Sequence, residues 1–468
     1  MLPDPSLLDA TTWEKGVLPN MGPRLGIFQY GPQVYPSFRH DFDLDSNFYS
    51  KQPLVNLDQW QNIIDYYVAT SPDSLPKQDR KQTIQSNLPF FSVELPRFSY
   101  SNPTTSFVKI NGDSLHSLII SDALRHNIYF LNRQLEITDS LFYGPVVDMA
   151  FMQGKMLACD IGVLNPNNGK FGKAQLITDE HGKITVDSIP LFAGLRRPVQ
   201  ISPADLNNDG RQDYVVCEFG NLTGALSWME NMGDKKFTRH VLRASPGAIK
   251  AYINDYNQDG APDIWALFAQ GEEGIFLFTN KGNGNFETRE MLRFPSSYGS
   301  SYFEFADFNK DGHPDIVYTC GDNADFSPIL KPYHGVYIFL NNGANEFQQQ
   351  YFFPINGCYK AIARDFDDDG DLDIATISFF ADYDHQPEES FVYLENKGNS
   401  ANVFNFQPYS FREAKSGRWL TMDAGDMDGD GRLDLVLGNF SLSAPGMKSA
   451  SNWKNFYPFV VLKNTGKK

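Results

Sequence analysis

One nine-residue phrase occurs five times in this chain. The copies are DLNNDGRQD from Asp205, DYNQDGAPD from Asp255, DFNKDGHPD from Asp307, DFDDDGDLD from Asp365 and DMDGDGRLD from Asp426. Their starts lie 50, 52, 58 and 61 residues apart. This period fits one four-stranded propeller blade per copy and is too long for ankyrin, tetratricopeptide or leucine-rich repeats. The repeat therefore predicts a ring of similar β-sheet units.

Each copy has Asp at position 1, Asp or Asn at position 3, Asp at positions 5 and 9, and Gly at position 6. The four acidic or amide side chains and the position 7 carbonyl can converge on one hard cation, and glycine permits the sharp turn. Oxygen-only ligands favour Ca²⁺ over zinc or magnesium, so we expect up to five Ca²⁺ ions, one per phrase. The predicted ligand residues are Asp205, Asn207, Asp209, Arg211, Asp213, Asp255, Asn257, Asp259, Ala261, Asp263, Asp307, Asn309, Asp311, His313, Asp315, Asp365, Asp367, Asp369, Asp371, Asp373, Asp426, Asp428, Asp430, Arg432 and Asp434.

Two other kinds of structure share features of this phrase. An EF-hand loop begins alike but needs a bidentate Glu at position 12 and flanking helices. Position 12 is here Val216, Ala266, Tyr318, Thr376 or Leu437, each inside a β-rich run. Five ordinary Asx turns are the second interpretation. Repetition in one register favours the calcium loop over both.

These residues resemble the FG-GAP or VCBS repeats of integrin-type propellers and of many secreted bacterial proteins, and the resemblance covers about residues 100–468. It implies an all-β propeller in which each loop joins the first two strands of a blade. The flanking sequence agrees, since apolar runs follow the loops and a third strand ends in Asn-x-Gly, as in IFLFTNKG and VYIFLNNG.

The strand pattern predicts a seven-bladed propeller of four-stranded antiparallel blades over residues 89–468, after a helical segment at 1–88. Two blades without the Asp phrase precede the five that carry it. Residues 89–98, which include FFSVELPRF, are expected to supply the fourth strand of the last blade and so close the ring. The expected blades are about 104–146, 147–198, 199–248, 249–298, 299–357, 358–415 and 416–468.

The loops between second and third strands would all lie on the face opposite the calcium loops. They are long in the last three blades, and long loops on a rigid scaffold often carry function. Their aromatic, acidic and histidine side chains suit a glycan or protein ligand, although such loops can also simply pack on one another. The candidate ligand-binding residues are Tyr333, His334, Asp382, Tyr383, Asp384, His385, Glu388, Trp453 and Tyr457.

Residues 1–88 predict helices instead of blades. Asn56 can cap a helix whose Trp60, Ile63, Ile64 and Tyr67 share one face, and an earlier helix is expected through SLLDATTWEKGVLP. The segment resembles the part of a c-type cytochrome module that follows haem attachment. It lacks CxxCH, so no haem is expected in this chain, and Met21, which matches an axial-ligand position, is more simply a packing residue.

Charge and hydropathy limit the classes of function. A formal net charge of −17 argues against a nucleic-acid-binding surface. No 18-residue apolar run predicts a membrane span, and no leader is recognised in the sequence. Weak extracellular-type calcium loops would fill only outside the cytoplasm. We therefore expect a periplasmic, cell-surface or secreted protein, of bacterial type by the resemblance and monomeric.

Three functions follow from these features. The first is a non-enzymatic, calcium-stabilised module that binds a glycan or a protein. The second is a polysaccharide lyase or hydrolase acting on acidic glycans, for which His385, His334 and Tyr383 are the candidate groups. The third is a docking module of a haem-linked redox protein. No catalytic residue is assigned, because two histidines in loops are a weak signal.

Overall fold

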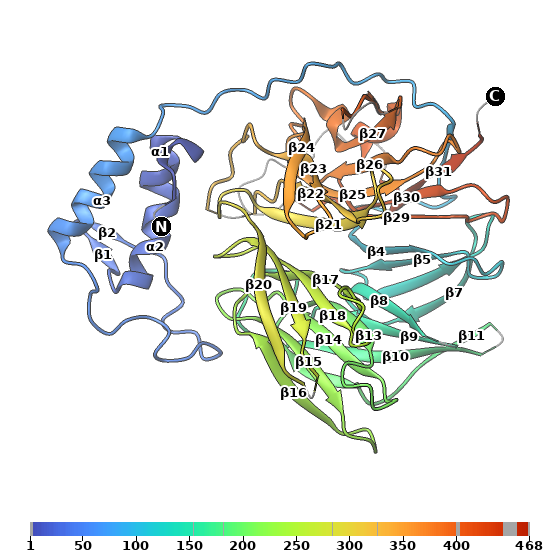
Figure 1. Cartoon of the computed structure of the whole chain (residues 1–468), viewed down its shortest axis with the longest axis horizontal. Helices are drawn as coiled ribbons and strands as arrows, with labels where there is room; N and C mark the ends of the chain where they lie inside the picture. Colours follow the sequence, from blue (N-terminus) through green and yellow to red (C-terminus); the bar gives the residue numbers. More distant parts are fainter. Residues whose placement is uncertain are drawn as a thin grey trace.

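The computed structural model describes residues 3–152, 154–180, 182–282, 284–324, 326–398, 403–442 and 456–466. Its described strands form seven antiparallel blades of a β-propeller, with a small helical unit beside the ring, as Figure 1 shows. This confirms the predicted fold class. Within each blade the first strand lies innermost, beside the first strands of the neighbouring blades, and strands that are consecutive in the chain are hydrogen-bonded neighbours. The last blade takes its fourth strand from before the first blade.

The blades follow one another along the chain. The first two contain β4 (Thr105–Ile110), β5 (Leu118–Asp122), β6 (Asn127–Leu131), β7 (Ile137–Phe142), β8 (Val146–Met152), β9 (Lys155–Asp160), β10 (Gly172–Glu180) and β11 (Lys183–Val186). A short extra strand, β12 (Phe192–Leu195), pairs with the start of β10. The second blade therefore has one strand more than the sequence pattern predicts.

Five blades carry the Asp phrase between their first two strands. Blades three to five contain β13 (Pro198–Ala204), β14 (Asp213–Glu218), β15 (Ala225–Asn231), β16 (Phe237–Arg243), β17 (Ala248–Asn254), β18 (Asp263–Phe268), β19 (Gly274–Asn280), β20 (Phe286–Arg293), β21 (Ser300–Ala306), β22 (Asp315–Cys320), β23 (Gly335–Asn341) and β24 (Phe347–Pro354). Blades six and seven contain β25 (Cys358–Arg364), β26 (Asp373–Ser378), β27 (Phe391–Asn396), β28 (Phe406–Tyr409), β29 (Trp419–Gly425), β30 (Asp434–Asn439) and β31 (Phe459–Asn464).

The ring closes between distant parts of the chain. Strand β3 (Phe91–Glu94) pairs antiparallel with β31 and is the fourth strand of blade seven, with Val93 opposite Leu462. The Phe91 ring packs edge-on against Phe366 and Tyr393, which belong to blade six. Residues from before the first blade thus cover the last blade, and closure removes the exposed sheet edge that an open ring would present.

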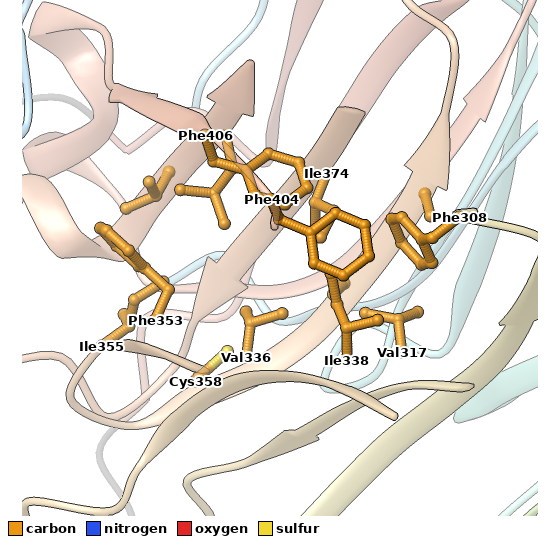
Figure 2. Packing of buried hydrophobic residues seen from close by; sticks show 14 of the residues in the cluster. Phe308, Val317, Val336, Ile338, Phe353, Ile355, Cys358, Ile374, Phe404 and Phe406 are labelled. Carbon is orange, nitrogen blue, oxygen red and sulfur yellow. The ribbon is translucent and has the colours of Figure 1, made fainter. Parts of the chain in front are cut away.

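The hydrophobic core lies between neighbouring blades. Figure 2 shows one such layer, in which Val336, Ile338 and Phe353 of blade five meet Ile374 and Phe406 of blade six. Alternate residues of each strand face opposite sides of its sheet, so one blade contributes to two such layers. The near-continuous apolar second strands, such as DIVYTC at 315–320, are buried on both faces for this reason.

The N-terminal unit has its own small core. It comprises η1 (Pro5–Leu7), α1 (Ala10–Thr12), the π-helical turn η2 (Trp13–Val17), α2 (Leu18–Met21), η3 (Gly22–Leu25), the hairpin β1 (Gln29–Tyr30) and β2 (Gln33–Val34), and α3 (Leu57–Thr70). Asn56 and Gln59 form a capping box at the start of α3, and Trp60 and Tyr67 are buried. The α3 segment was therefore predictable from its cap and its apolar face.

The segment after α3 crosses the propeller to reach β3, as the blue trace of Figure 1 shows. Gln78 Nε2 donates to the His334 carbonyl at 2.9 Å, and Arg80 forms an ion pair with the buried Glu389. Further on, Gln85 exchanges backbone hydrogen bonds with blade six, since its N–H donates to Pro408 O and its carbonyl accepts from Ser410 N. The crossing segment is thus bound to blades five and six along its length.

We expect closure to contribute measurably to stability. Replacing Phe91 with alanine should lower the free energy of unfolding by about 2 kcal/mol, less than for a fully buried ring because Phe91 is partly exposed. The check is a urea denaturation curve. Phe142→Ala is the control, because that ring is 79% exposed, and equal stability of the two variants would contradict the packing role of β3.

Candidate metal centres

The five Asp loops share one backbone geometry. Position 1 follows the inner strand, and position 9 begins the second strand. Position 6 glycines have φ between +79° and +91°, as at Gly210 and Gly370. Position 4 also has positive φ in every loop, a feature that the sequence does not display because the residues there differ. They are Asn208, Gln258, Lys310, Asp368 and Gly429.

The position 1 aspartate holds the turn together. In the fourth loop, Asp365 Oδ1 accepts a hydrogen bond from Asp369 N at 3.2 Å, and Oδ2 accepts one from Gly370 N at 2.9 Å. The same two bonds recur in the other four loops, to positions 5 and 6. Position 5 in turn accepts from the position 7 N–H, as Asp369 does from Asp371. The loop is therefore folded by its own carboxylates.

The position 9 aspartate is buried and joins three segments. Asp373 Oδ2 accepts from Phe366 N at 3.2 Å, and Oδ1 accepts from Asn396 N at 2.8 Å. Equivalent bonds link each position 9 carboxylate to position 2 of its loop and to the asparagine that ends the third strand. In every loop a buried carboxylate therefore accepts two backbone hydrogen bonds and links the loop to the third strand.

The side chain of the asparagine that ends the third strand also binds the Asp loop, whereas the sequence pattern predicted only a turn there. Asn396 Nδ2 donates to Leu372 O at 3.1 Å, and its Oδ1 accepts from Gly398 N at 3.2 Å. In blade seven, Asn464 Nδ2 also donates to Phe366 O of blade six at 2.7 Å. The Asn-x-Gly motif therefore fixes the loop to the third strand and, here, one blade to the next.

The carboxylates converge as a cation site requires. In the fourth loop Asp365, Asp367 and Asp373 each bring an oxygen within 4.8 Å of the others, and Asp426, Asp428 and Asp434 do so in the fifth. In the first three loops position 3 is asparagine, whose amide oxygen can serve in the same place. This oxygen-only donor set, on a loop that turns at glycine, fits Ca²⁺.

Burial disfavours charge at position 9. Desolvation raises the pKa of Asp373 to about 7 and the pKa values of Asp315 and Asp434 to about 6. Neighbouring loop carboxylates add to this, whereas the backbone donors oppose it. A bound divalent cation would favour the ionised form, so a proton and a cation compete for the same group.

Cationic side chains contact several of these carboxylates. Lys463 Nζ lies 2.5 Å from Asp428 Oδ2, and Lys310 Nζ lies 2.7 Å from Asp371 Oδ1 of the next loop. Arg211 reaches back to Asp209 at 2.5 Å. These residues partly offset the repulsion between the clustered carboxylates.

A further cluster lies on the blades that lack the Asp phrase. Asp113 and His116 on the β4–β5 connection meet Asp179 of blade two, and His116 Nδ1 lies 2.7 Å from Asp179 Oδ2. The histidine is buried. Asp179 lies 63 positions after His116, so local spacing could not have indicated the group, and the hydrogen bond between them joins blades one and two.

The predicted ligand-binding residues fall into two groups, one covered by the N-terminal unit and one exposed to solvent. Tyr333 and His334 lie beneath the N-terminal unit: Tyr333 Oη donates to Leu7 O at 2.9 Å, and His334 is fully buried. They do not form the open surface that the loop lengths suggest. His334 is covered, while His385 is exposed on the loop between β26 and β27 (residues 379–390), which we call the blade-six loop. The two histidines therefore do not form an accessible pair.

The blade-six loop remains accessible. Asp384 and His385 are exposed, and Asp382, Tyr383 and Glu388 are half-buried. Asp382 contacts His385 Nδ1 at 3.0 Å, and the Arg418 guanidinium lies 5.2 Å from the centre of the Tyr383 ring. Tyr457 is half-buried, and Trp453 lies outside the described residues.

Met21 and the resemblance to a cytochrome module both concern the N-terminal unit. Met21 packs against the hydrophobic core of the N-terminal unit, whose centre is Trp13, Trp60 and Tyr67. The likeness of this unit to a cytochrome module stays a prediction. Among the described residues no helix is both long and apolar enough to cross a membrane.

The loops and the ring of four-stranded blades together fit a β-propeller of the FG-GAP type. A family model described as FG-GAP-like repeat matches residues 205–266 and 255–318, which span the first three Asp loops and the strands between them.

Three curated relatives are similar to much of the chain. Cartilage acidic protein 1 of Xenopus tropicalis is 26% identical over 326 residues, which cover 60% of this chain and 47% of that protein. The proteins of the same name from Mus musculus and Homo sapiens are each 28% identical over 265 residues, covering 53% of this chain and 38% of theirs. The chain thus spans less than half the length of these relatives. All three are vertebrate proteins, and a bacterial origin for this chain stays a prediction.

The left-handed glycines provide a test of loop geometry. Gly370→Ala should destabilise the chain by about 1–2 kcal/mol, because φ is +91° there although nothing lies within 4 Å of an added Cβ. Gly112→Ala is the matched control, since its Cβ would also be free but its φ is not left-handed. Thermal unfolding of the two variants should differ; equal melting temperatures would contradict the loop geometry.

The raised pKa values of Asp373, Asp315 and Asp434 predict how calcium and pH act together. A raised pKa favours the folded calcium-free chain at low pH, and this contribution is lost as pH rises through about 6 to 7. Calcium needs the ionised groups, so the rise in melting temperature on adding calcium should be larger at pH 8 than at pH 5.5. A rise that is equal at both pH values would contradict the competition.

Proposed function

We propose that the chain is a calcium-stabilised, extracytoplasmic binding module whose ligand is a glycan or a protein. The observation that carries the calcium assignment is the convergence of Asp365, Asp367 and Asp373, and of Asp426, Asp428 and Asp434, in oxygen-only loops. Each loop is built on the same hydrogen bonds, so we expect one Ca²⁺ per loop. A closed ring without open sheet edges supports a monomer.

Calcium availability supports a location outside the cytoplasm. Extracellular calcium modules commonly have dissociation constants of about 10⁻⁴ to 10⁻³ M, which extracellular calcium can saturate and cytosolic calcium cannot. The name of the vertebrate relatives, cartilage acidic protein 1, refers to a tissue rich in extracellular matrix and is consistent with this location.

The blade-six loop is the best candidate for contact with the ligand. It projects from the face opposite the calcium loops, and its exposed Asp384 and His385 lie near the stacked Arg418 and Tyr383. Side chains that combine charge, hydrogen-bonding groups and aromatic rings suit glycan or protein recognition. The covered Tyr333 and His334 would instead hold the N-terminal unit in place.

Screening on a glycan array, with and without calcium, would identify a glycan ligand. For a ligand found in this way, the double variant Asp384→Asn/His385→Ala should weaken binding by about tenfold, because it removes two exposed polar contacts. Asp234→Asn, an exposed aspartate in the turn between β15 and β16, is the control and should bind as the unaltered chain does. Unchanged affinity in the double variant would exclude the blade-six loop as the contact surface.

A further inference from the structure

A polar pocket lies on the calcium-loop side of the ring, where the first and last blades meet. It has a volume of about 620 Å³, within the range of small-molecule sites. The closing strand, the β6–β7 turn and the fifth calcium loop all contribute to it. Its lining residues are Glu94, Leu95, Arg97, Arg133, Gln134, Leu135, Asp428 and Lys463.

Arg133 is the unusual residue in this pocket. Among the described residues it forms no ion pair, and its buried Nε has no hydrogen-bond acceptor. An arginine guanidinium carries five donors, and leaving a buried one unsatisfied costs free energy unless a ligand accepts it. Arg133 is therefore poised to bind an anionic group.

The fifth calcium loop is shaped around this arginine. Position 4 carries a side chain in the other four loops but is Gly429 here. A Cβ at Gly429 would lie 2.8 Å from Arg133 Nη2, so a side chain at this position would displace the guanidinium. The one loop with glycine at position 4 is thus the loop against which an arginine packs.

Two further cations line the pocket, and one of them is linked to the calcium site. Arg97 is exposed and pairs with Glu136 at 2.6 Å. Lys463 pairs with Asp428, which would be a calcium ligand at position 3. Calcium on Asp428 would compete with Lys463 for this carboxylate, leaving the ammonium free and adding positive charge beside the pocket.

We propose that this pocket binds the sulfate or carboxylate groups of an acidic glycan, with Arg133 as the principal contact. Arginine forms paired hydrogen bonds to such planar or tetrahedral oxyanions. Glu94 and the Gln134 amide can accept hydrogen bonds from sugar hydroxyls, while the apolar lining is limited to Leu95 and the buried Leu135. This mixture suits a hydroxyl-rich acidic sugar better than a peptide.

The pocket does not depend on the ligand surface of blade six. Only its coupling to calcium rests on the proposed function, because Lys463 is freed when the fifth loop binds the ion. Calcium should therefore tighten glycan binding several-fold, but Arg133 should contribute in its absence as well.

The experiment is calorimetric titration of the full chain with a heparin-derived tetrasaccharide and with a tetragalacturonate, in 150 mM salt, with calcium or with EDTA. These two probes separate sulfate from carboxylate recognition.

Because the chain has a net charge of −17, non-specific attraction to a polyanion is unfavourable. Arg133→Gln should lower the affinity for the better probe about tenfold in both buffers. Arg289→Gln, which removes an exposed arginine of blade four, should leave the affinity unchanged.

Two variants test the construction of the pocket. Gly429→Asn keeps a residue type that the first loop carries at this position, and it should weaken glycan binding by displacing Arg133. Asp428→Asn reproduces the asparagine found at position 3 of the first three loops and removes the partner of Lys463. In EDTA it should raise the glycan affinity toward the value measured for the unaltered chain in calcium.

The titrations test glycan binding by the pocket separately from its dependence on calcium. Loss of binding in Arg133→Gln with no calcium effect would support the pocket and contradict the calcium coupling. Absence of binding to both probes, equal loss in Arg289→Gln, or tighter binding of a polyglutamate peptide of equal charge would overturn the acidic-glycan proposal.

Discussion

A buried aspartate at the start of the second strand joins three segments in each of five blades. Its oxygens accept backbone hydrogen bonds from the loop before it and from the asparagine at the end of the third strand, as Asp373 does from Phe366 and Asn396. A charge in this position is costly unless it is compensated. The donors compensate it in part, and a cation among the loop carboxylates would complete the compensation. We therefore expect the loops to be most stable as a calcium complex.

The same chain that forms the ring also covers part of it. The segment from residue 78 to β3 runs along blades five and six and then closes blade seven. It contacts the buried His334 and Glu389. The N-terminal unit contacts the loop between β22 and β23 separately, through the hydrogen bond from Tyr333 to Leu7 O. The long loops of blades five and six consequently differ: the first packs against the N-terminal unit, and the second remains accessible. This leaves two separate polar surfaces, the blade-six loop and the pocket around Arg133, on opposite faces of the ring.

The ring was predictable because its signals are local and repeated. The Asp phrase, the apolar second strand and the Asn-x-Gly turn recur together at intervals of 50 to 61 residues, so even the blades without the phrase could be inferred by counting. The α3 helix was predictable from Asn56 and its apolar face. The burial of Tyr333 and His334 was not, because it depends on contacts with residues such as Leu7 and Gln78 more than 250 positions away. The Arg133 pocket was missed for the same reason, since it is assembled from both ends of the propeller sequence.

The most direct test of the central claim is to count the bound ions. Native mass spectrometry of the chain, first stripped with EDTA and then exchanged into millimolar calcium, should show a mass increase equal to five Ca²⁺ ions, one for each Asp loop. The same experiment on Asp365→Ala should show four, because position 1 of one loop is lost. A chain that binds no calcium under these conditions, or a variant that keeps the full number, would contradict the account.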